Sequence, residues 1–315
     1  MNRPAADRRL RAALTAVVEP GDAALARHLA AEGSAAGWAS LRAGDTTLDP
    51  TGSRTARAQE VDGADVLERG TARGLRFVIP GDAEWPFGLS ILDDSLAMSD
   101  PVVPPIGLWV RGDADLAEIT DGAVAVVGAR AATQYGERAA SDLAADLSGT
   151  GWSVVSGGAY GIDAAAHRGA LAVGEATLAV LACGADVAYP RAHAELLDRI
   201  AATGAVVSEL APGTRPAKSR FLLRNRLIAG MTSGVVVVEA ARRSGALNTA
   251  NWADRLGRGV GAVPGPITSS LSAGCHALVR ERNATLVTDV NDVQEMVGAW
   301  LPVPGASRAE TVERG

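Results

Sequence analysis

The sequence AVAVVGAR at residues 123–130, with WSVVSGGAYGIDAAAHRGALAVG at residues 152–174, decides the fold. The first run holds only small and β-branched apolar residues up to Gly128, which is the pattern of a buried strand that ends in a turn. Residues 135–149, between the two runs, are expected to form a helix. Strands that alternate with helices predict βαβ units, and therefore an α/β fold with a mostly parallel sheet and helices on both faces. Similar short apolar runs recur at residues 177–190, 204–210, 233–241, 257–265 and 283–289.

The residues before this sheet are expected to form a small all-helical domain. Apolar residues recur at helical spacing from Asp7 onward, a Pro-Gly pair ends this pattern, and Asp22 is suited to cap the next helix. The helical pattern continues to about Arg69. We interpret residues 1–70 as a packing or interaction module, of the SAM or helix–hairpin–helix kind; the alternative is a helix–turn–helix element that binds nucleic acid.

Two further segments complete the expected organisation. Residues 76–110 contain short apolar runs interrupted by Pro and Gly, and residues 108–111 are expected to form a strand that leads into the sheet. The α/β domain is expected to span residues 71–300. Only LPVPGASRAETVERG follows it, so residues 301–315 are expected to be a disordered tail.

Composition places the chain among ordinary globular proteins. It has 315 residues, of which 47% are hydrophobic and 21% charged, enough for about two domains with a large core. Cys183 and Cys275 lie too far apart in sequence to form a metal-ligand motif, and so few cysteines favour a reducing compartment. The first residues hold only a broken apolar run. We therefore expect no signal peptide, no membrane contact and a cytoplasmic location.

The stretch ELAPGTRPAKSRFLLRNRLIAGMTSGVVVVE, from Glu209 to Glu239, is cationic although the protein has a formal net charge of -6. No acidic residue lies between the two terminal glutamates, and Lys218 is the only lysine of the whole chain. A cationic stretch beside glycine-rich turns indicates a polyanion site; the alternative is a set of solvated loop charges. The basic residues of the stretch are Arg215, Lys218, Arg220, Arg224 and Arg226.

Glycine-rich turns follow successive strands of the expected sheet. In such sheets, ligands bind beyond the carboxyl ends of the strands. Glycine lets backbone N–H groups approach a phosphate, the next helix N-terminus adds partial positive charge, and Arg130 offers a forked donor. Glycines after strands also suit ordinary turns, so several such turns together carry more weight than one. The candidate binding residues at these strand ends are Gly128, Arg130, Ser156, Gly157, Gly158, Gly161, Gly184, Arg191 and Glu239.

Several common enzymatic sites are not supported by the sequence. No G-x-G-x-x-G follows the first strand, which disfavours a dinucleotide dehydrogenase, and the absence of G-x-x-x-x-G-K-[ST] disfavours P-loop ATP hydrolysis. Asp163 and His167 would lie one helical turn apart, but no third ligand is spaced to complete a metal site, so a structural hydrogen bond is favoured. We therefore expect no catalytic residues, no metal and no cofactor.

The motifs SGGAYGIDAAAHRGAL, FLLRNRLIAGM and VVVVEAARRSGALNTA, with AVVGAR before them and AVPGP after them, resemble the DNA-processing protein A family (DprA/Smf). The resemblance covers residues 76–296. It implies an extended Rossmann-like domain, preceded by a small helical domain, that binds single-stranded DNA. It also implies that the protein is not an enzyme but hands the strand to the RecA recombinase in natural transformation or related recombination, acting as a homodimer.

The resemblance also assigns roles to individual residues. It implies that Arg130 is a DNA phosphate contact, and that Lys218 and Phe221 lie in a basic loop that holds the strand. Three glycines of the second turn match the family's glycine-rich loop. The R-N-R of the family is made by Arg224, Asn225 and Arg226.

Three departures from the family pattern stand out. Ala129 occupies a position where serine is common, which removes one hydroxyl donor. Leu222 replaces the proline usual after the phenylalanine, so the basic loop is expected to be less rigid. The sequence after Trp300 has no counterpart of the C-terminal winged-helix domain of many members.

Two alternatives to DNA binding stay open. Related Rossmann-like proteins hydrolyse the glycosidic bond of nucleoside monophosphates with a P-G-G-x-G-T-x-x-E loop, but here the loop reads SGGAYGID, with no glutamate in the matching place. A sensor that binds a free nucleotide in the same pocket is the second alternative. The expected homodimer has apolar candidates between Val260 and Val297, which alternatively just cover the sheet; they are Leu271, Leu278, Val279, Leu286 and Met296.

Overall fold

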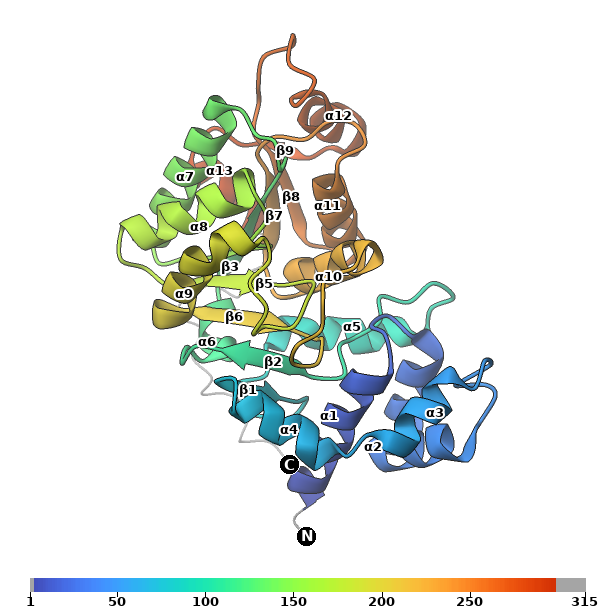
Figure 1. The fold of residues 1–315 in the computed structure, drawn as a ribbon. Helices are drawn as coiled ribbons and strands as arrows, with labels where there is room; N and C mark the ends of the chain where they lie inside the picture. The colour runs from blue at the N-terminus through green and yellow to red at the C-terminus, as the bar shows by residue number, and fades with distance from the viewer. Residues whose placement is uncertain (1–2, 299–315) are drawn as a thin grey trace, which may run out of the picture.

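The computed structural model describes residues 3–298, and its centre is one nine-stranded sheet within these residues (Figure 1). The strand order is β1-β2-β6-β5-β4-β3-β7-β8-β9, in which β6 through β9 pair in parallel and β1 and β2 add an antiparallel edge. The predicted α/β fold with a mostly parallel sheet is confirmed. The strands are β1 (Leu75–Val78), β2 (Leu108–Arg111), β3 (Ala123–Val127), β4 (Ser153–Ser156), β5 (Thr177–Val180), β6 (Ala205–Ser208), β7 (Gly234–Val237), β8 (Gly259–Ala262) and β9 (Thr285–Leu286).

Helices cover both faces of this sheet, as Figure 1 shows. On one face lie α7 (Gln134–Gly149), α8 (Ile162–Ala172), α9 (Ala194–Thr203) and α13 (Val290–Gly298). On the other lie α5 (Ser90–Asp94), α6 (Leu116–Thr120), α10 (Lys218–Gly230), α11 (Gly245–Arg255) and α12 (Ala273–Arg282). Three short 3-10 turns are η1 (Phe87–Leu89), η2 (Ser95–Ala97) and η3 (Arg191–His193).

Strand β3 shows why the apolar runs in the sequence are continuous rather than alternating. Val124 and Val126 pack into the cluster under α7 and α8, whereas Ala125 and Val127 point to the opposite face, toward α10 and α11. Successive residues of a strand point to opposite faces, so a strand covered on both sides needs apolar residues at every position. All five residues of β3 are buried.

The order of strands places a topological switch beside β3. From β3 the chain moves to β4, β5 and β6 on one side, then returns to β7 on the other side, with Val127 opposite Val237 in the parallel register. The connections after β3 and β7 therefore leave in opposite directions. In an open α/β sheet, the carboxyl ends of strands at such a point form a crevice that can receive a ligand.

Residues 3–71 form a helical unit, in which α1 to α3 share a core of their own. Asp22 caps α2 as predicted, since its side chain accepts a hydrogen bond from the backbone N–H of Leu25. Gly33, with a φ of 84°, interrupts α2 and lets it fold back on itself. Leu14 and Leu41 are fully buried in the shared core. The helices are α1 (Arg3–Val17), α2 (Ala23–Ala43), α3 (Ser53–Glu60) and α4 (Gly63–Thr71).

This helical unit packs on the antiparallel edge of the sheet through Trp109 of β2. Its ring is fully buried, lies 4.4 Å from the Phe77 ring between centroids, and donates from Nε1 to Thr15 Oγ1 at 3.2 Å. Gly70 of α4 lies directly against the ring, where a Cβ atom would come within 2.3 Å of it. The helical unit thus covers one face of the two edge strands.

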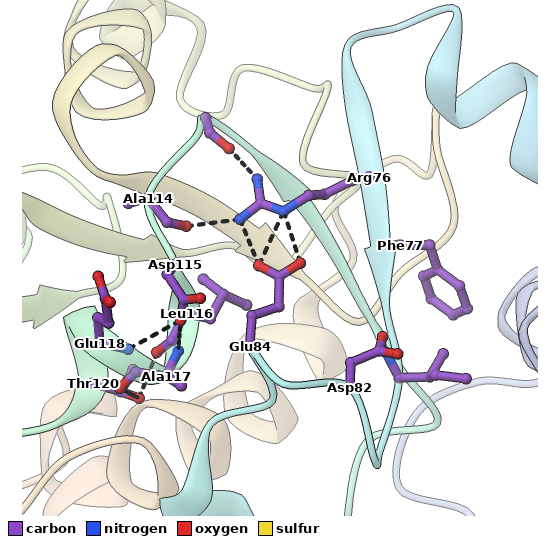
Figure 2. Close-up of polar contacts among 12 residues, drawn as sticks. Arg76, Phe77, Asp82, Glu84, Ala114, Asp115, Leu116, Ala117, Glu118 and Thr120 are labelled. Carbon is purple, nitrogen blue, oxygen red and sulfur yellow. Dashed lines mark hydrogen bonds and ion pairs between the residues drawn. The ribbon is translucent and has the colours of Figure 1, made fainter. Parts of the chain in front are cut away.

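Hydrogen bonds from Arg76 connect β1 to the turn between β2 and α6. Figure 2 shows Arg76 of β1 between the Glu84 carboxylate, at 2.8 Å from Nη2, and the carbonyl of Ala114, at 2.7 Å. Its Nη1 also donates to the Gly112 carbonyl. Nearby, Asp115 caps α6 by accepting from backbone N–H groups. These half-buried contacts fix the turn between β2 and α6.

The strand predicted at residues 108–111 is confirmed, but its antiparallel pairing with β1 and β6 was not predicted. The tail expected at residues 301–315 lies outside the described residues. Within residues 3–298, no helix combines the length and the apolar character needed to span a bilayer.

Candidate nucleic-acid interface

A hollow of about 600 Å³ lies at the carboxyl ends of the parallel strands. We call it the central hollow. Its lining comes from the segments that follow β3, β4, β5, β6 and β7, so residues far apart in sequence meet at the predicted place. The N-terminal ends of α8, α10 and α11 contribute to the lining, through Asp163, Lys218 and Gly245. The partial positive charge of helix N-termini favours an anionic ligand here.

The basic segment of the central hollow is helical. Lys218 is the first residue of α10 and Phe221 completes its first turn, whereas the sequence reading placed both in a loop. Leu222, which replaces the family's proline, suits this helix, because proline inside a helix removes a hydrogen bond. The exposed ammonium of Lys218 lies at a helix N-terminus, where the helix dipole disfavours a cation and a bound anion would offset the cost.

Arg130 and Phe221 form the rim of the central hollow. The guanidinium carbon of Arg130 lies 4.8 Å from the centroid of the Phe221 ring, in a cation–π contact. The Tyr189 ring lies 5.6 Å from the same phenyl ring. Arg130 is exposed and makes no hydrogen bond or ion pair with the residues that the structure describes. Its guanidinium N–H groups are therefore available to a ligand.

Glu239 holds the segment that carries Arg130. Its carboxylate accepts from the backbone N–H of Thr133 at 2.9 Å and from Thr133 Oγ1 at 2.6 Å, while its carbonyl accepts from Ala129 N at 2.7 Å. The side chain is only 2% exposed and does not line the central hollow. This residue therefore positions the turn between β3 and α7 and faces away from the ligand space.

Two glycines of the segment after β4 lie where no side chain would fit. A Cβ atom at Gly157 would lie 2.5 Å from Arg224 Nη2 and 2.6 Å from Asp163 Oδ2. One at Gly161 would lie 2.3 Å from the Ala129 carbonyl, and its φ of 70° is strained for other residues. These glycines allow the segments after β3 and β4 to approach each other and to form the floor of the central hollow.

A buried pair of opposite charges lies in that floor. Arg224 donates to the carbonyls of Gly157, at 2.9 Å, and of Val180, and Asp163 accepts from Ala159 N at 3.3 Å. Burial raises the pKa of Asp163, an effect that the neighbouring Arg224 charge opposes. Burial also lowers the pKa of Arg224 to about 10, which still leaves it charged at neutral pH. The pair thus fixes the glycine-rich segment from below.

His167 belongs to the core, and the structural hydrogen bond expected between it and Asp163 is not formed. Its Nδ1 lies 2.8 Å from Thr177 Oγ1, and its Nε2 has no partner among the described residues. Burial lowers the pKa of His167 to about 3, so the ring is neutral at physiological pH. No group of three or more His, Cys, Asp or Glu side chains within residues 3–298 is arranged to hold a metal ion.

Arg226 has a different environment from the other residues of the R-N-R motif. Its side chain is 1% exposed, and its two terminal nitrogens each lie 2.6 Å from an oxygen of Glu209. Its Nε donates to the carbonyl of Val103 at 2.6 Å. The residue does not line the central hollow. The geometry gives Arg226 a structural role that joins α10, the end of β6 and the segment before β2.

The predicted site residues differ in their relation to the central hollow. Six line it, whereas Gly157, Gly158 and Gly161 do not and instead let the segment after β4 pack closely against its neighbours. Others support the hollow from behind: Ser156 is buried and donates to the Val126 carbonyl, and the Gly184 amide donates to Thr214. Arg191 is exposed on η3 and is not in the lining. The six that line the central hollow are Gly128, Arg130, Lys218, Phe221, Arg224 and Asn225.

The candidate binding residues chosen from the sequence include none from the start of α11, although the sequence places Ser244 and Gly245 after a strand of the sheet. Ser244 caps this helix and lines the central hollow together with Gly245 and Thr249. The Asn225 side chain reaches this helix, with Nδ2 3.3 Å from the Gly245 carbonyl and 3.2 Å from Asn248 Oδ1. The signal was present in the SGALNTA motif, which follows the β7 strand as other glycine-rich turns follow theirs.

Comparison with known proteins identifies the family. The model of the family described as DNA recombination-mediator protein A matches residues 76–298. The chain belongs to this family. It is 48% identical over 288 residues to a DprA protein of Mycobacterium tuberculosis, covering 90% of this chain and 74% of the relative. It is 44% identical over 206 residues to DNA processing protein DprA of Streptococcus pneumoniae, covering 65% and 72%.

Solved structures agree with this assignment. DNA processing protein A from Streptococcus pneumoniae superposes with a TM-score of 0.74 at 31% identity, covering 90% of this chain and 95% of that one. DNA processing protein A from Helicobacter pylori, whose structure concerns its single-stranded DNA binding mode, gives a TM-score of 0.59 at 26% identity. It covers 72% of this chain and 96% of that one. The fold that carries the central hollow is therefore shared with DprA family members.

Proposed function

We propose that this protein binds single-stranded DNA in the central hollow. The observation that carries the proposal is that two exposed cations, Arg130 and Lys218, line this hollow together with the Phe221 ring. The N-terminal ends of three helices contribute to the same lining. Neither cation has an acidic partner among the described residues. Arginine binds phosphate oxygens through its forked donors, and lysine acts as a point charge.

The rim favours an unpaired strand over a duplex. An aromatic ring stacks on a base only when that base is not already stacked and paired inside a helix. Phe221 and Tyr189 offer two rings beside the cations, and base–aromatic stacking contributes about 1–3 kcal/mol per base. Since few rings are present, phosphate contacts should dominate, and we expect little sequence preference and strong salt dependence.

The comparisons support the same proposal. The Helicobacter pylori structure, which concerns single-stranded DNA, is 26% identical and covers 72% of this chain. The name of the matching family also points to recombination. On this basis we propose that the protein acts in DNA processing in the cytoplasm, handing the bound strand to the RecA recombinase in natural transformation or related recombination. A homodimer would place two hollows on one strand and raise the effective concentration of the second site.

We also propose that the protein performs no chemical step on the DNA. The acidic side chain nearest the glycine-rich segment, Asp163, is buried against Arg224 and bonded to the backbone. Although Asp163 borders the central hollow, its carboxylate accepts from the Ala159 N–H and lies beside the Arg224 charge, which gives it a structural and not a catalytic role. The arrangement therefore argues against the nucleoside-monophosphate hydrolase alternative.

A nucleotide sensor is the second candidate, because a hollow of about 600 Å³ is within the range of small-ligand sites. A competition experiment separates the two. A fluorescent oligothymidylate of about 15 nucleotides, bound at low salt, is titrated with TMP or with the unlabelled oligonucleotide. The proposal predicts displacement by the oligonucleotide at micromolar concentrations and none by TMP at a thousandfold excess. Tight TMP binding with weak oligonucleotide binding would favour the sensor.

A further inference from the structure

A second hollow, of about 410 Å³, lies between α11 and α12. We call it the lateral hollow. One wall is the face of α11 that carries Asn248 and Asn251, and the other is the facing side of α12 with Glu281 and Arg282. Its mouth is formed by the segment after β7 that precedes α11. None of the residues that line it is aromatic.

The lateral hollow adjoins the central hollow at the start of α11. Ser244, the capping residue of α11, lines both of them. Across the boundary, the Asn225 side chain of the central hollow lies 3.2 Å from Asn248 of the lateral one. A chain-like ligand that extends over Ser244 would therefore reach from the central hollow to the lateral hollow.

The lateral hollow is cationic inside an acidic protein. Arg243 is exposed and forms no ion pair or hydrogen bond with any residue that the structure describes. The 60% exposed Arg242 side chain lies 3.2 Å from Glu281, whose carboxylate also accepts from Arg280 at 2.8 Å. One glutamate is thus shared by two arginines, in exposed pairs that are worth little and exchange readily. Arg282 adds a third arginine to the lining and contacts Asn251.

We propose that the lateral hollow is a second segment of the strand-binding groove, which receives the sugar–phosphate backbone of nucleotides beyond the central hollow. Arginines and amide side chains supply donors for phosphate and sugar oxygens, whereas the lack of aromatic residues excludes base stacking. The lateral hollow therefore adds affinity only for strands long enough to occupy both hollows. This inference rests on the proposed function of the central hollow and extends it to Arg242 and Arg243.

The test compares two oligothymidylates, of about 5 and about 20 nucleotides, with the full-length protein. The double variant Arg242→Ala/Arg243→Ala should bind the long strand about tenfold more weakly and the short strand within about twofold of wild type. The magnitude of its log–log salt slope for the long strand should fall by about 1.4, as expected for two lost phosphate contacts. The variant Glu281→Gln should change affinity in the opposite direction for the long strand alone.

The matched control is Arg168→Ala/Arg199→Ala, which removes two exposed arginines from α8 and α9 on the other side of the sheet. It lowers the net charge equally and should leave both affinities near wild type. Equal binding of the long strand by wild type and by the Arg242/Arg243 variant would overturn the inference and leave the proposed function intact. If wild type binds neither strand, both are overturned.

Discussion

The two halves of helix α10 carry the same kind of charge in opposite environments. In its first turn, Lys218 is exposed and borders the central hollow beside Phe221. Two turns later, Arg226 is buried and ion-paired with Glu209. The basic residues from Lys218 to Arg226 therefore lie on one helix, with a ligand-facing start and a buried, structural Arg226 near its end. Charge density in a sequence indicates that cations are needed, but burial decides which of them remain available for binding.

The largest expected effect is a loss of folding stability, caused by a variant in the buried half of α10. Arg226→Ala leaves the Glu209 carboxylate buried without its partner, which costs about 3–5 kcal/mol of folding free energy in comparable cases. We expect a large drop in the urea midpoint or loss of soluble protein. The double variant Arg226→Met/Glu209→Leu, which replaces both charges by apolar groups of similar length, should recover a substantial part of the loss. Unchanged stability in Arg226→Ala would contradict the structural role.

The pH dependence of stability tests the buried, neutral state of His167. The pKa of His167 is about 3 in the folded protein against 6.5 when unfolded, so the unfolded chain binds more protons between these values. Stability from this group is fully present above pH 6.5 and decreases as the pH falls toward 3, by up to about 1.4 kcal/mol per pH unit. The free energy of unfolding of His167→Gln should therefore depend less steeply on pH. Parallel curves for variant and wild type would refute this assignment.

Variants of the two exposed cations should lose affinity for DNA but keep their stability. Arg130→Ala and Lys218→Ala should each weaken oligonucleotide binding by about 1.5–3 kcal/mol, since each removes a charge-assisted phosphate contact. The unfolding midpoints should stay near wild type, because both side chains are exposed. Fluorescence anisotropy at low salt measures the first and urea denaturation the second. The prediction fails if affinity is unchanged in both variants, or if their stability falls as in Arg226→Ala.

A smaller effect is expected at the aromatic rim. Phe221→Leu keeps an apolar side chain but removes the ring that contacts Arg130, so it should lose about 1–2 kcal/mol of binding to a single strand. A double-mutant cycle with Arg130→Ala isolates the coupling between the two side chains. Additive losses would show that the cation–π contact does not contribute to binding.

The smallest effect concerns the contact between the helical unit and α10. Arg220 donates to Glu19 at 2.5 Å, and this hydrogen bond lowers the pKa of Glu19. Because Glu19 is partly exposed, Glu19→Gln should change the unfolding free energy by at most about 1 kcal/mol. It should also raise oligonucleotide affinity slightly, since it removes a negative charge near the cationic turn. Weaker binding by this variant would mean that the contact positions α10 for DNA.

The fold was largely predictable because buried parallel strands require continuous apolar runs, and β3 and β7 have them. The place of the site followed from the strand-end rule. The burial of Arg226 was not predictable, because it depends on Glu209 and on the Val103 carbonyl, which the fold brings together from distant segments. The helical state of the basic segment was missed because the family pattern indicated a loop, although leucine instead of proline at position 222 favours a helix.

The measurement that tests the central claim most directly is the affinity of the full-length protein for a single strand of about 20 nucleotides and for the blunt duplex of the same length, each across a salt series. If the central hollow binds single-stranded DNA, the single strand should bind more tightly than the duplex at every salt concentration, and its affinity should fall steeply as salt rises. The same claim predicts a smaller salt slope for Arg130→Ala/Lys218→Ala. Tighter binding of the duplex, or single-strand binding that is indifferent to salt and to these two side chains, would contradict it.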